Sequence, residues 1–232
     1  MSAQVDFPSP TRPISETPLR YGVIIYPGYQ ALDIFGPLDA LNTLSLYFPL
    51  QLSVIAQTLD PVSTKPPGSL GNLAADFGQT IIPTHTFDTA PPVDVLIVPG
   101  GIGNRDPKNV EAAIAYVAKV YPTLQYLVTV CTGSGMAAEA GVLDGRRATT
   151  NKRAWARTTQ LRPQVHWEAH ARWVVDGNIW TSSGVSAGLD VIFAFMGEVY
   201  GEEVATAIAN FLEYERHMDA SWDPYAGLYG LA

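Results

Sequence analysis

The chain has 232 residues, of which 47% are hydrophobic and 16% are charged, a composition typical of a globular protein with a large core. Its formal net charge of −8 argues against nucleic acid as a partner, because a protein that binds a phosphate backbone needs a basic face. No apolar run approaches the roughly 18 residues that cross a membrane, and the polar N-terminus lacks the apolar centre of a signal peptide.

An extension is expected to precede the folded domain. Residues 1–20 include four prolines among polar residues, which predicts a segment that is flexible or lies on the surface. Residues 21–26 form an apolar and aromatic run that is typical of a buried strand. A loop through Asp33 follows, and a helix is expected over residues 36–46, because proline at position 37 favours a first helical turn.

Strands and helices alternate along the rest of the chain. Further strands are expected over residues 50–56, 74–83, 93–98 and 125–130, and further helices over residues 109–120, 133–140, 153–160, 186–200 and 202–214. An Asp-Gly pair at 176–177 predicts a hairpin. The alternation predicts one α/β domain over residues 21–214, with a mainly parallel central sheet and helices on both faces. Residues 215–232 form an aromatic tail that covers this domain or reaches a partner subunit.

Cys131 is the only cysteine in the chain. It follows an apolar, β-branched run and precedes small residues that open a helix, which predicts a strand-to-helix turn with an exposed sulfur. The N-terminus of the following helix is expected to favour the thiolate, as a nucleophile requires. The alternative is a small, buried apolar residue.

Because one cysteine cannot form a disulfide within the chain, a reducing compartment is expected, most simply the cytoplasm.

Three loops are expected to meet at the carboxyl ends of the parallel strands, where such sheets bind ligands. They are residues 27–33, 99–103 and 131–135. Asp33 lies among apolar residues in the first loop, and burial there would raise its pKa and make it a candidate general acid near neutral pH. The alternative for Asp33 is an N-cap of the helix expected from residue 36.

Gly100 and Gly101 end a core strand, and their backbone N–H groups can approach a ligand closely. The N–H groups of Gly101 and Thr132 are candidate donors to negative charge that develops on a substrate at Cys131. The alternative for the glycines is an ordinary tight turn. The Thr132 hydroxyl is a candidate donor to Asp33, to substrate or to water, and it is also suited to cap the following helix.

We expect no metal site and no organic cofactor. His166 and His170 are four residues apart, but that spacing needs a helix, and their segment runs into the predicted hairpin. Neither a phosphate-binding P-loop nor a dinucleotide fingerprint is present, and a serine hydrolase is not expected.

Six segments together resemble the DJ-1/PfpI (ThiJ) superfamily and follow the order of that family. They are residues 23–28, 32–37, 96–101, 130–133, 140–150 and 181–190. The resemblance spans about residues 21–211 and implies a flavodoxin-like α/β sandwich, a nucleophilic Cys131 and a homodimer.

Within this superfamily the chain is most similar to the isocyanide (isonitrile) hydratase branch. That branch has an aspartate in an Asp-x-x-Gly-Pro setting, here Asp33, and a threonine after the cysteine, here Thr132. Close relatives usually have a histidine where this chain has Asn151, and asparagine cannot carry a proton. A Cys-His pair of the glyoxalase type therefore loses support, while Asn151 remains a possible auxiliary residue. The next residue, Lys152, is expected on the surface.

The resemblance implies hydration of an isocyanide to an N-substituted formamide, with Cys131 as nucleophile, Asp33 as general acid and base, and Gly100, Gly101 and Thr132 orienting the reacting groups. The alternatives are another enzyme of the superfamily (a glyoxalase, or a lyase or cyclase acting on a specialised metabolite) or a thiol sensor or binding protein without catalysis. Similar segments occur in AraC-type regulators, but this chain is acidic and ends about twenty residues after its last expected helix. A small-molecule substrate is therefore expected, without a nucleic acid or membrane partner.

Overall fold

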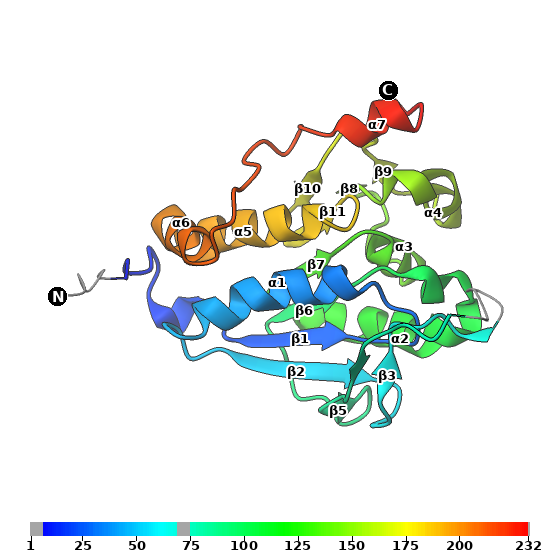
Figure 1. Ribbon diagram of the computed structural model, residues 1–232, viewed down its shortest axis with the longest axis horizontal. Helices are drawn as coiled ribbons and strands as arrows, with labels where there is room; N and C mark the ends of the chain where they lie inside the picture. The colour runs from blue at the N-terminus through cyan, green and yellow to red at the C-terminus, as the bar shows by residue number, and fades with distance from the viewer. Residues whose placement is uncertain (1–6, 69–74, 232) are drawn as a thin grey trace.

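A seven-stranded sheet runs through the centre of the computed structural model, which describes residues 7–68 and 75–231 (Figure 1). The strand order is β10-β11-β7-β6-β1-β2-β5, and every neighbouring pair is parallel except β10 and β11. The strands are β1 (Arg20–Ile24), β2 (Gln51–Ala56), β5 (His85–Thr86), β6 (Val95–Val98), β7 (Tyr126–Thr129), β10 (Trp173–Asp176) and β11 (Ile179–Ser182). The predicted mainly parallel sheet is confirmed.

Helices cover both faces of this sheet, as predicted. The helix α1 packs against α5 and α6 in one layer, whereas α2 packs against α3 in another (Figure 1). The helices are α1 (Ala31–Leu44), α2 (Pro107–Val120), α3 (Gly133–Glu139), α4 (Trp155–Leu161), α5 (Ala187–Val199), α6 (Glu202–Phe211) and α7 (Pro224–Leu228). Between these layers β6 is buried at every residue, because its apolar side chains meet a helix on either side. None of the described helices is long and apolar enough to cross a membrane.

Two short strand pairs and several 3-10 helices lie outside the central sheet. The strands β3 (Val62–Ser63) and β4 (Thr80–Ile81) pair antiparallel, and β8 (Arg147–Ala148) and β9 (His166–Trp167) pair in parallel. The described residues also form the 3-10 helices η1 (Ile14–Glu16), η3 (Ile102–Arg105), η4 (Tyr121–Thr123) and η5 (Lys152–Ala154). Because His166 lies on a strand, its spacing to His170 does not place the two imidazoles on one helical face.

The prediction for the first helix was wrong at its start. The helix α1 begins at Ala31 rather than at residue 36, and Pro37 lies inside it. Because proline lacks an N–H, it is most common in the first turn of a helix, where this group has no partner. Inside a helix the lost backbone hydrogen bond can be offset by packing. Gly36 allows that packing, since a Cβ added there would lie 3.2 Å from Leu189 of α5. Asp33 is thus already within the helix and is not its N-cap.

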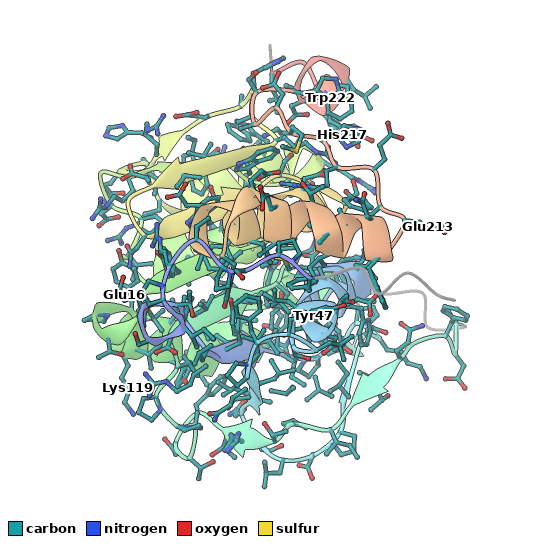
Figure 2. The ribbon with its side chains drawn as sticks, turned by 90° about the vertical axis from the view of Figure 1, so that its left-hand side faces the viewer. Glu16, Tyr47, Lys119, Glu213, His217 and Trp222 are labelled. Atoms are coloured by element: carbon teal, nitrogen blue, oxygen red, sulfur yellow. The ribbon has the colours of Figure 1, made fainter. Side chains whose placement is uncertain are left out.

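The first and last described segments pack on the domain. Thr11 donates a backbone hydrogen bond to Tyr200, and Phe7 stacks on Tyr47, which follows α1 (Figure 2). After α6 the chain returns across the molecule to α7 (Figure 1), and Asp223, the N-cap of α7, pairs with Lys152 of η5. His217 and Trp222 stack on each other along this return, with ring centroids 4.3 Å apart (Figure 2).

Candidate active site

The three loops that were predicted to converge do meet at the carboxyl ends of β1, β6 and β7. Gln30 N–H donates to the Gly100 carbonyl at 2.8 Å, and Gly103 N–H donates to the Gly28 carbonyl at 3.0 Å. The residue before the cysteine, Val130, donates to the carbonyl of Val98 at 3.0 Å. Backbone hydrogen bonds therefore hold the loops together whichever side chains they carry.

Cys131 lies at the turn between β7 and α3 with a φ of 58°. This left-handed conformation is unfavourable for a side chain with a Cβ, at a cost of about 1–3 kcal/mol. Two hydroxyl groups oppose the strain, because Ser134 and Thr150 each donate to the Cys131 carbonyl at 3.1 Å. The predicted strand-to-helix turn is confirmed, but the side chain is buried rather than exposed.

Asp33 is completely buried on the first turn of α1. Its Oδ2 accepts a hydrogen bond from the Gly100 N–H at 2.8 Å, while Oδ1 has no well-formed hydrogen bond within the described residues. Burial raises the pKa of Asp33 to about 7, and contacts with Gly100 and the Cys131 thiol oppose this shift only in part. The carboxyl group therefore exchanges a proton near neutral pH, as the sequence predicted.

The thiol of Cys131 has a raised pKa, which corrects the expectation that the helix N-terminus favours the thiolate. Burial is the main cause and the charge of Asp33 adds to it, whereas hydrogen bonds from Thr132 and the Asn151 side chain oppose the shift. The helix α3 has only seven residues, and its effect at the first turn does not outweigh the loss of water. The resting residue is a protonated thiol.

Thr132 and the two glycines form the frame of the site. The Thr132 hydroxyl oxygen accepts from the Gly101 N–H at 3.2 Å and from the Asn104 amide at 2.8 Å. Both glycine N–H groups are thus directed at protein acceptors, Gly100 at Asp33 and Gly101 at Thr132. A Cβ on Gly100 would lie 2.6 Å from the Thr132 backbone nitrogen, so this position has no room for a side chain.

Asn104 and Tyr26 also belong to the site, and sequence reasoning missed both. Asn104 follows the Gly-Gly turn in η3 and donates to both the carbonyl and the hydroxyl oxygen of Thr132. The Tyr26 hydroxyl donates to the Pro99 carbonyl at 3.0 Å, and its pKa is raised by burial and by the nearby Asp33 and Cys131. Their position just after β1 and β6 was the available signal, since the ends of these strands were expected to line the site.

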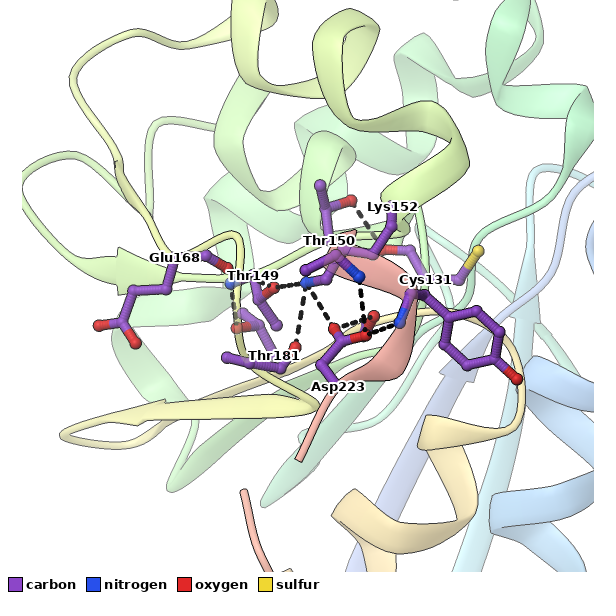
Figure 3. Close-up of polar contacts among 11 residues, drawn as sticks. Cys131, Thr149, Thr150, Lys152, Glu168, Thr181 and Asp223 are labelled. Atoms are coloured by element: carbon purple, nitrogen blue, oxygen red, sulfur yellow. Dashed lines mark hydrogen bonds and ion pairs between the residues drawn. The ribbon is translucent and has the colours of Figure 1, made fainter. Parts of the chain in front are cut away.

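Asn151 is the N-cap of η5 and contacts Cys131, and Lys152 is the first residue of this 3-10 helix. The Asn151 side-chain oxygen caps this helix by accepting from Ala154 N–H at 3.1 Å, and its side chain also hydrogen-bonds the cysteine. Lys152 is buried, not solvated as expected (Figure 3). Its Nζ donates to Thr149 Oγ1 at 2.6 Å and pairs with Asp223 Oδ2 at 3.2 Å. These partners, together with the carbonyl of Ala171 at 3.0 Å, explain how a lysine is accommodated without water.

A second motif near the site was also missed. Residues 184–188 have the Gly-x-Ser-x-Gly spacing of serine-hydrolase turns and follow β11. Ser186, however, has an ordinary helical backbone with a φ of −71°. Only Cys131 and Glu213 among the described non-glycine residues have positive φ. The strained turn of this site therefore carries Cys131, not Ser186.

The described residues also contain no cluster of three His, Cys, Asp or Glu side chains suited to a metal.

The sequence pattern of the DJ-1/PfpI family matches residues 20–198. The chain belongs to the DJ-1/PfpI family. It is 32% identical to an isonitrile hydratase of Pseudomonas putida over 84% of this chain and 78% of that protein. A deglycase of Pyrococcus horikoshii is also 32% identical, over 55% of this chain and 74% of the deglycase. The transcriptional regulator GbdR of Pseudomonas aeruginosa is 33% identical over 61% of this chain but only 38% of the regulator.

Solved structures agree with this DJ-1/PfpI assignment and with the flavodoxin-like fold. A ThiJ/PfpI family protein from Pseudomonas syringae superposes with a TM-score of 0.68 at 26% identity, over 93% of this chain and 85% of the other. DJ-1beta of Drosophila melanogaster superposes with a TM-score of 0.69 at 18% identity, over 85% of this chain and 99% of the other. Proteins similar to this chain therefore include both enzymes and regulators, and the choice between these functions depends on the chemistry of the site.

Proposed function

We propose that this protein is a cofactor-independent isocyanide (isonitrile) hydratase, a lyase in which Cys131 is the nucleophile and Asp33 transfers the proton. The observation that carries the proposal is the buried carboxyl group of Asp33 against a thiol on a strained strand-to-helix turn. The 32% identical isonitrile hydratase of Pseudomonas putida supports the choice of substrate class.

The reaction starts from a thiol and a carboxylate. Cys131 gives its proton to Asp33, and the thiolate sulfur forms a bond to the terminal carbon of R–N≡C. Asp33 returns the proton to that carbon, which gives a thioimidate, Cys–S–CH=N–R. Water adds to this carbon while the nitrogen gains a proton. The C–S bond then breaks, R–NH–CHO leaves and the thiol is restored, so the net reaction adds one water to the isocyanide.

The residues around Asp33 and Cys131 position and stabilise these two groups in the proposed reaction. The Gly100 N–H stabilises the ionised form of Asp33, and the Gly101 N–H and Asn104 hold the Thr132 hydroxyl. The Thr132 N–H and the Asn151 side chain hydrogen-bond the sulfur and favour its thiolate form during attack. Gly100 and Gly101 thus act by positioning protein groups rather than by binding substrate directly.

The chemistry needs no metal or organic cofactor, because the sulfur makes and breaks the covalent bond.

A homodimer is part of the proposal. It is supported by Leu32 and Phe35, which leave 40% and 41% of their surface exposed on α1. Light scattering on the purified protein tests this part separately.

The direct test is hydration of a panel of isocyanides by the wild type, Cys131→Ala and Asp33→Asn, followed by formamide detection. The wild type is expected to form the formamide and Cys131→Ala to form none while keeping its circular dichroism spectrum. Methylglyoxal in the same panel tests the glyoxalase alternative, which Asn151 disfavours because asparagine cannot transfer a proton. Full activity of Cys131→Ala would contradict the mechanism. Rapid oxidation of Cys131 without turnover of any substrate would favour a thiol sensor.

A further inference from the structure

A cavity of about 450 Å³ adjoins the proposed active site. Two of its lining residues connect it to the reacting groups. Asn151 lines the cavity and hydrogen-bonds Cys131, and Leu32 lines it and precedes Asp33. The loop 183–187 between β11 and α5 forms a further wall. Cys131 itself does not line the cavity, and its hydrogen bond with Asn151 is what places the thiol next to this space.

The short helix α7 forms the outer wall of the cavity. Tyr225 and Tyr229 line it and are 47% and 44% exposed, so each tyrosine has one side against the protein and one in water. Leu228 lies on the same helix but does not line the cavity, and it is 71% exposed. Both tyrosines of α7 and its C-terminal end therefore lie on the side that lines the cavity.

A buried ion pair fixes this wall in place. Asp223 caps α7 by accepting from the N–H groups of Tyr225 and Ala226, at 2.8 and 3.3 Å, and its other oxygen pairs with Lys152 (Figure 3). Both side chains of this pair are only 1% exposed. Lys152 directly follows Asn151, so the segment that contacts the cysteine also holds the helix that closes the cavity.

The charges around the cavity favour an uncharged ligand. The two buried cations in its wall, Lys152 and Arg172, are neutralised by Asp223 and Asp190. The remaining cation, Arg153, is exposed to water. The other side chains of the wall are those of the two tyrosines, the aliphatic residues Leu32, Val185 and Ala187, and the uncharged polar residues Asn151, Ser183 and Ser186. An apolar group bound there gains by covering the tyrosine rings and the aliphatic side chains.

We infer that α7 is the specificity element of this enzyme: Tyr225 and Tyr229 contact a bulky apolar R group of the substrate, and the Lys152–Asp223 pair positions them. The inference rests on the proposed function, because it concerns the R group of R–N≡C. Lys152 and Asp223 are positioning residues and take no part in bond making.

Kinetics with two isocyanides test this inference. The value of kcat/KM is measured for cyclohexyl and methyl isocyanide with the wild type, Tyr225→Ala, Tyr229→Ala and the matched control Leu228→Ala. Each tyrosine variant is expected to lower the cyclohexyl-to-methyl ratio about tenfold, since it removes a half-exposed ring from an apolar contact. Leu228→Ala is expected to keep the ratio. Asp223→Asn is expected to raise KM for cyclohexyl isocyanide more than KM for methyl isocyanide.

A second measurement needs no turnover. Alkylation of Cys131 by iodoacetamide and by N-cyclohexyl-iodoacetamide is followed by mass spectrometry, because the two reagents share an electrophile and differ only in R. The tyrosine variants are expected to lose the wild-type preference for the larger reagent, and Leu228→Ala to keep it. Unchanged ratios in both assays overturn the role of α7 and leave the hydratase intact. A wild type that hydrates no isocyanide removes the hydratase, and the alkylation ratios then still decide whether α7 selects the R group.

Discussion

The carboxyl group of Asp33 lies beside the thiol of Cys131, and its charge adds to the burial that raises the pKa of that thiol. Burial also raises the pKa of Asp33 itself, to about 7. Above this pH the pair holds one proton, which rests on sulfur and can move to the carboxylate when the sulfur attacks. Below it the pair holds two protons, and no base is left to accept the proton of the thiol.

The first prediction concerns the pH dependence of hydration. Because the one-proton form of the pair is the reactive one, kcat/KM is expected to rise as the pH rises through about 7 and then to level off. Asp33→Asn is expected to lose about 10²-fold to 10⁴-fold in activity and to lose this rise, since asparagine has no titratable group. Rates between pH 5 and pH 9 check both points. A wild-type rate that falls through pH 7 would show that the two-proton form reacts.

The second prediction concerns stability, where the same group has the opposite effect. The pKa of Asp33 rises from 3.8 to about 7 on folding, so the native state binds a proton that the unfolded state has released between these values. The free energy of unfolding therefore falls as the pH rises from about 4 to about 7, by about 4 kcal/mol for a shift of this size. Asp33→Asn avoids this loss, and its side-chain oxygen can still accept from Gly100.

Urea unfolding of Asp33→Asn and the wild type at pH 5 and pH 8 measures this effect. The variant is expected to be the more stable protein at pH 8, with a smaller advantage at pH 5. Asp39→Asn is the matched control, because Asp39 is an exposed carboxylate on the same helix. An equal gain in both variants at pH 8 would attribute the effect to net charge rather than to burial.

The fold was predictable because its signals are local. The apolar runs at β1, β6 and β7 and the Asp-Gly pair at the β10–β11 hairpin each act within a few residues, and all four elements were expected near their observed positions. The start of α1 was not predictable in this way. Pro37 is accommodated inside the helix by packing between α1 and α5, and these two helices are far apart in the sequence.

The site was predictable in its residue types and less so in its environment. Cys131, Asp33 and Thr132 were predicted from strand-end topology and family motifs, and the structure brings their loops together through hydrogen bonds. The protonated thiol and the buried Lys152 were not foreseen, since both depend on how completely distant segments exclude water. Lys152 in particular is buried by Asp223, seventy-one positions later in the chain.

The third prediction concerns Asn104, which contacts no reacting atom in the proposed mechanism. Its amide donates to Thr132 Oγ1 and to the Thr132 carbonyl, so Asn104→Ala releases the residue next to Cys131, the proposed nucleophile. A small displacement of a catalytic group costs up to about 10²-fold in rate, so kcat is expected to fall within that range. Asn178→Ala is the control, because Asn178 lies at the amino end of β11 and bonds Tyr121 at 3.1 Å, away from the site. Equal kcat values for the two variants would remove Asn104 from the site.

The last prediction concerns the energy of the Lys152–Asp223 pair. Removing one member leaves the other charge buried, which costs about 3–5 kcal/mol, so both Lys152→Met and Asp223→Asn are expected to be strongly destabilised. The double variant buries no charge, and asparagine still caps α7. It is therefore expected to be more stable than the sum of the two single losses predicts.

A double-mutant cycle by chemical denaturation measures this coupling. The exposed pair Arg147–Glu168, with its side chains 58% and 38% exposed, is the control, and its coupling is expected to be below about 1 kcal/mol. Coupling between Lys152 and Asp223 as small as this would mean that water reaches the pair in solution. Their hold on α7 would then come from the cap at Asp223 alone, and Lys152→Met would leave both the cavity wall and the selection of the R group unchanged.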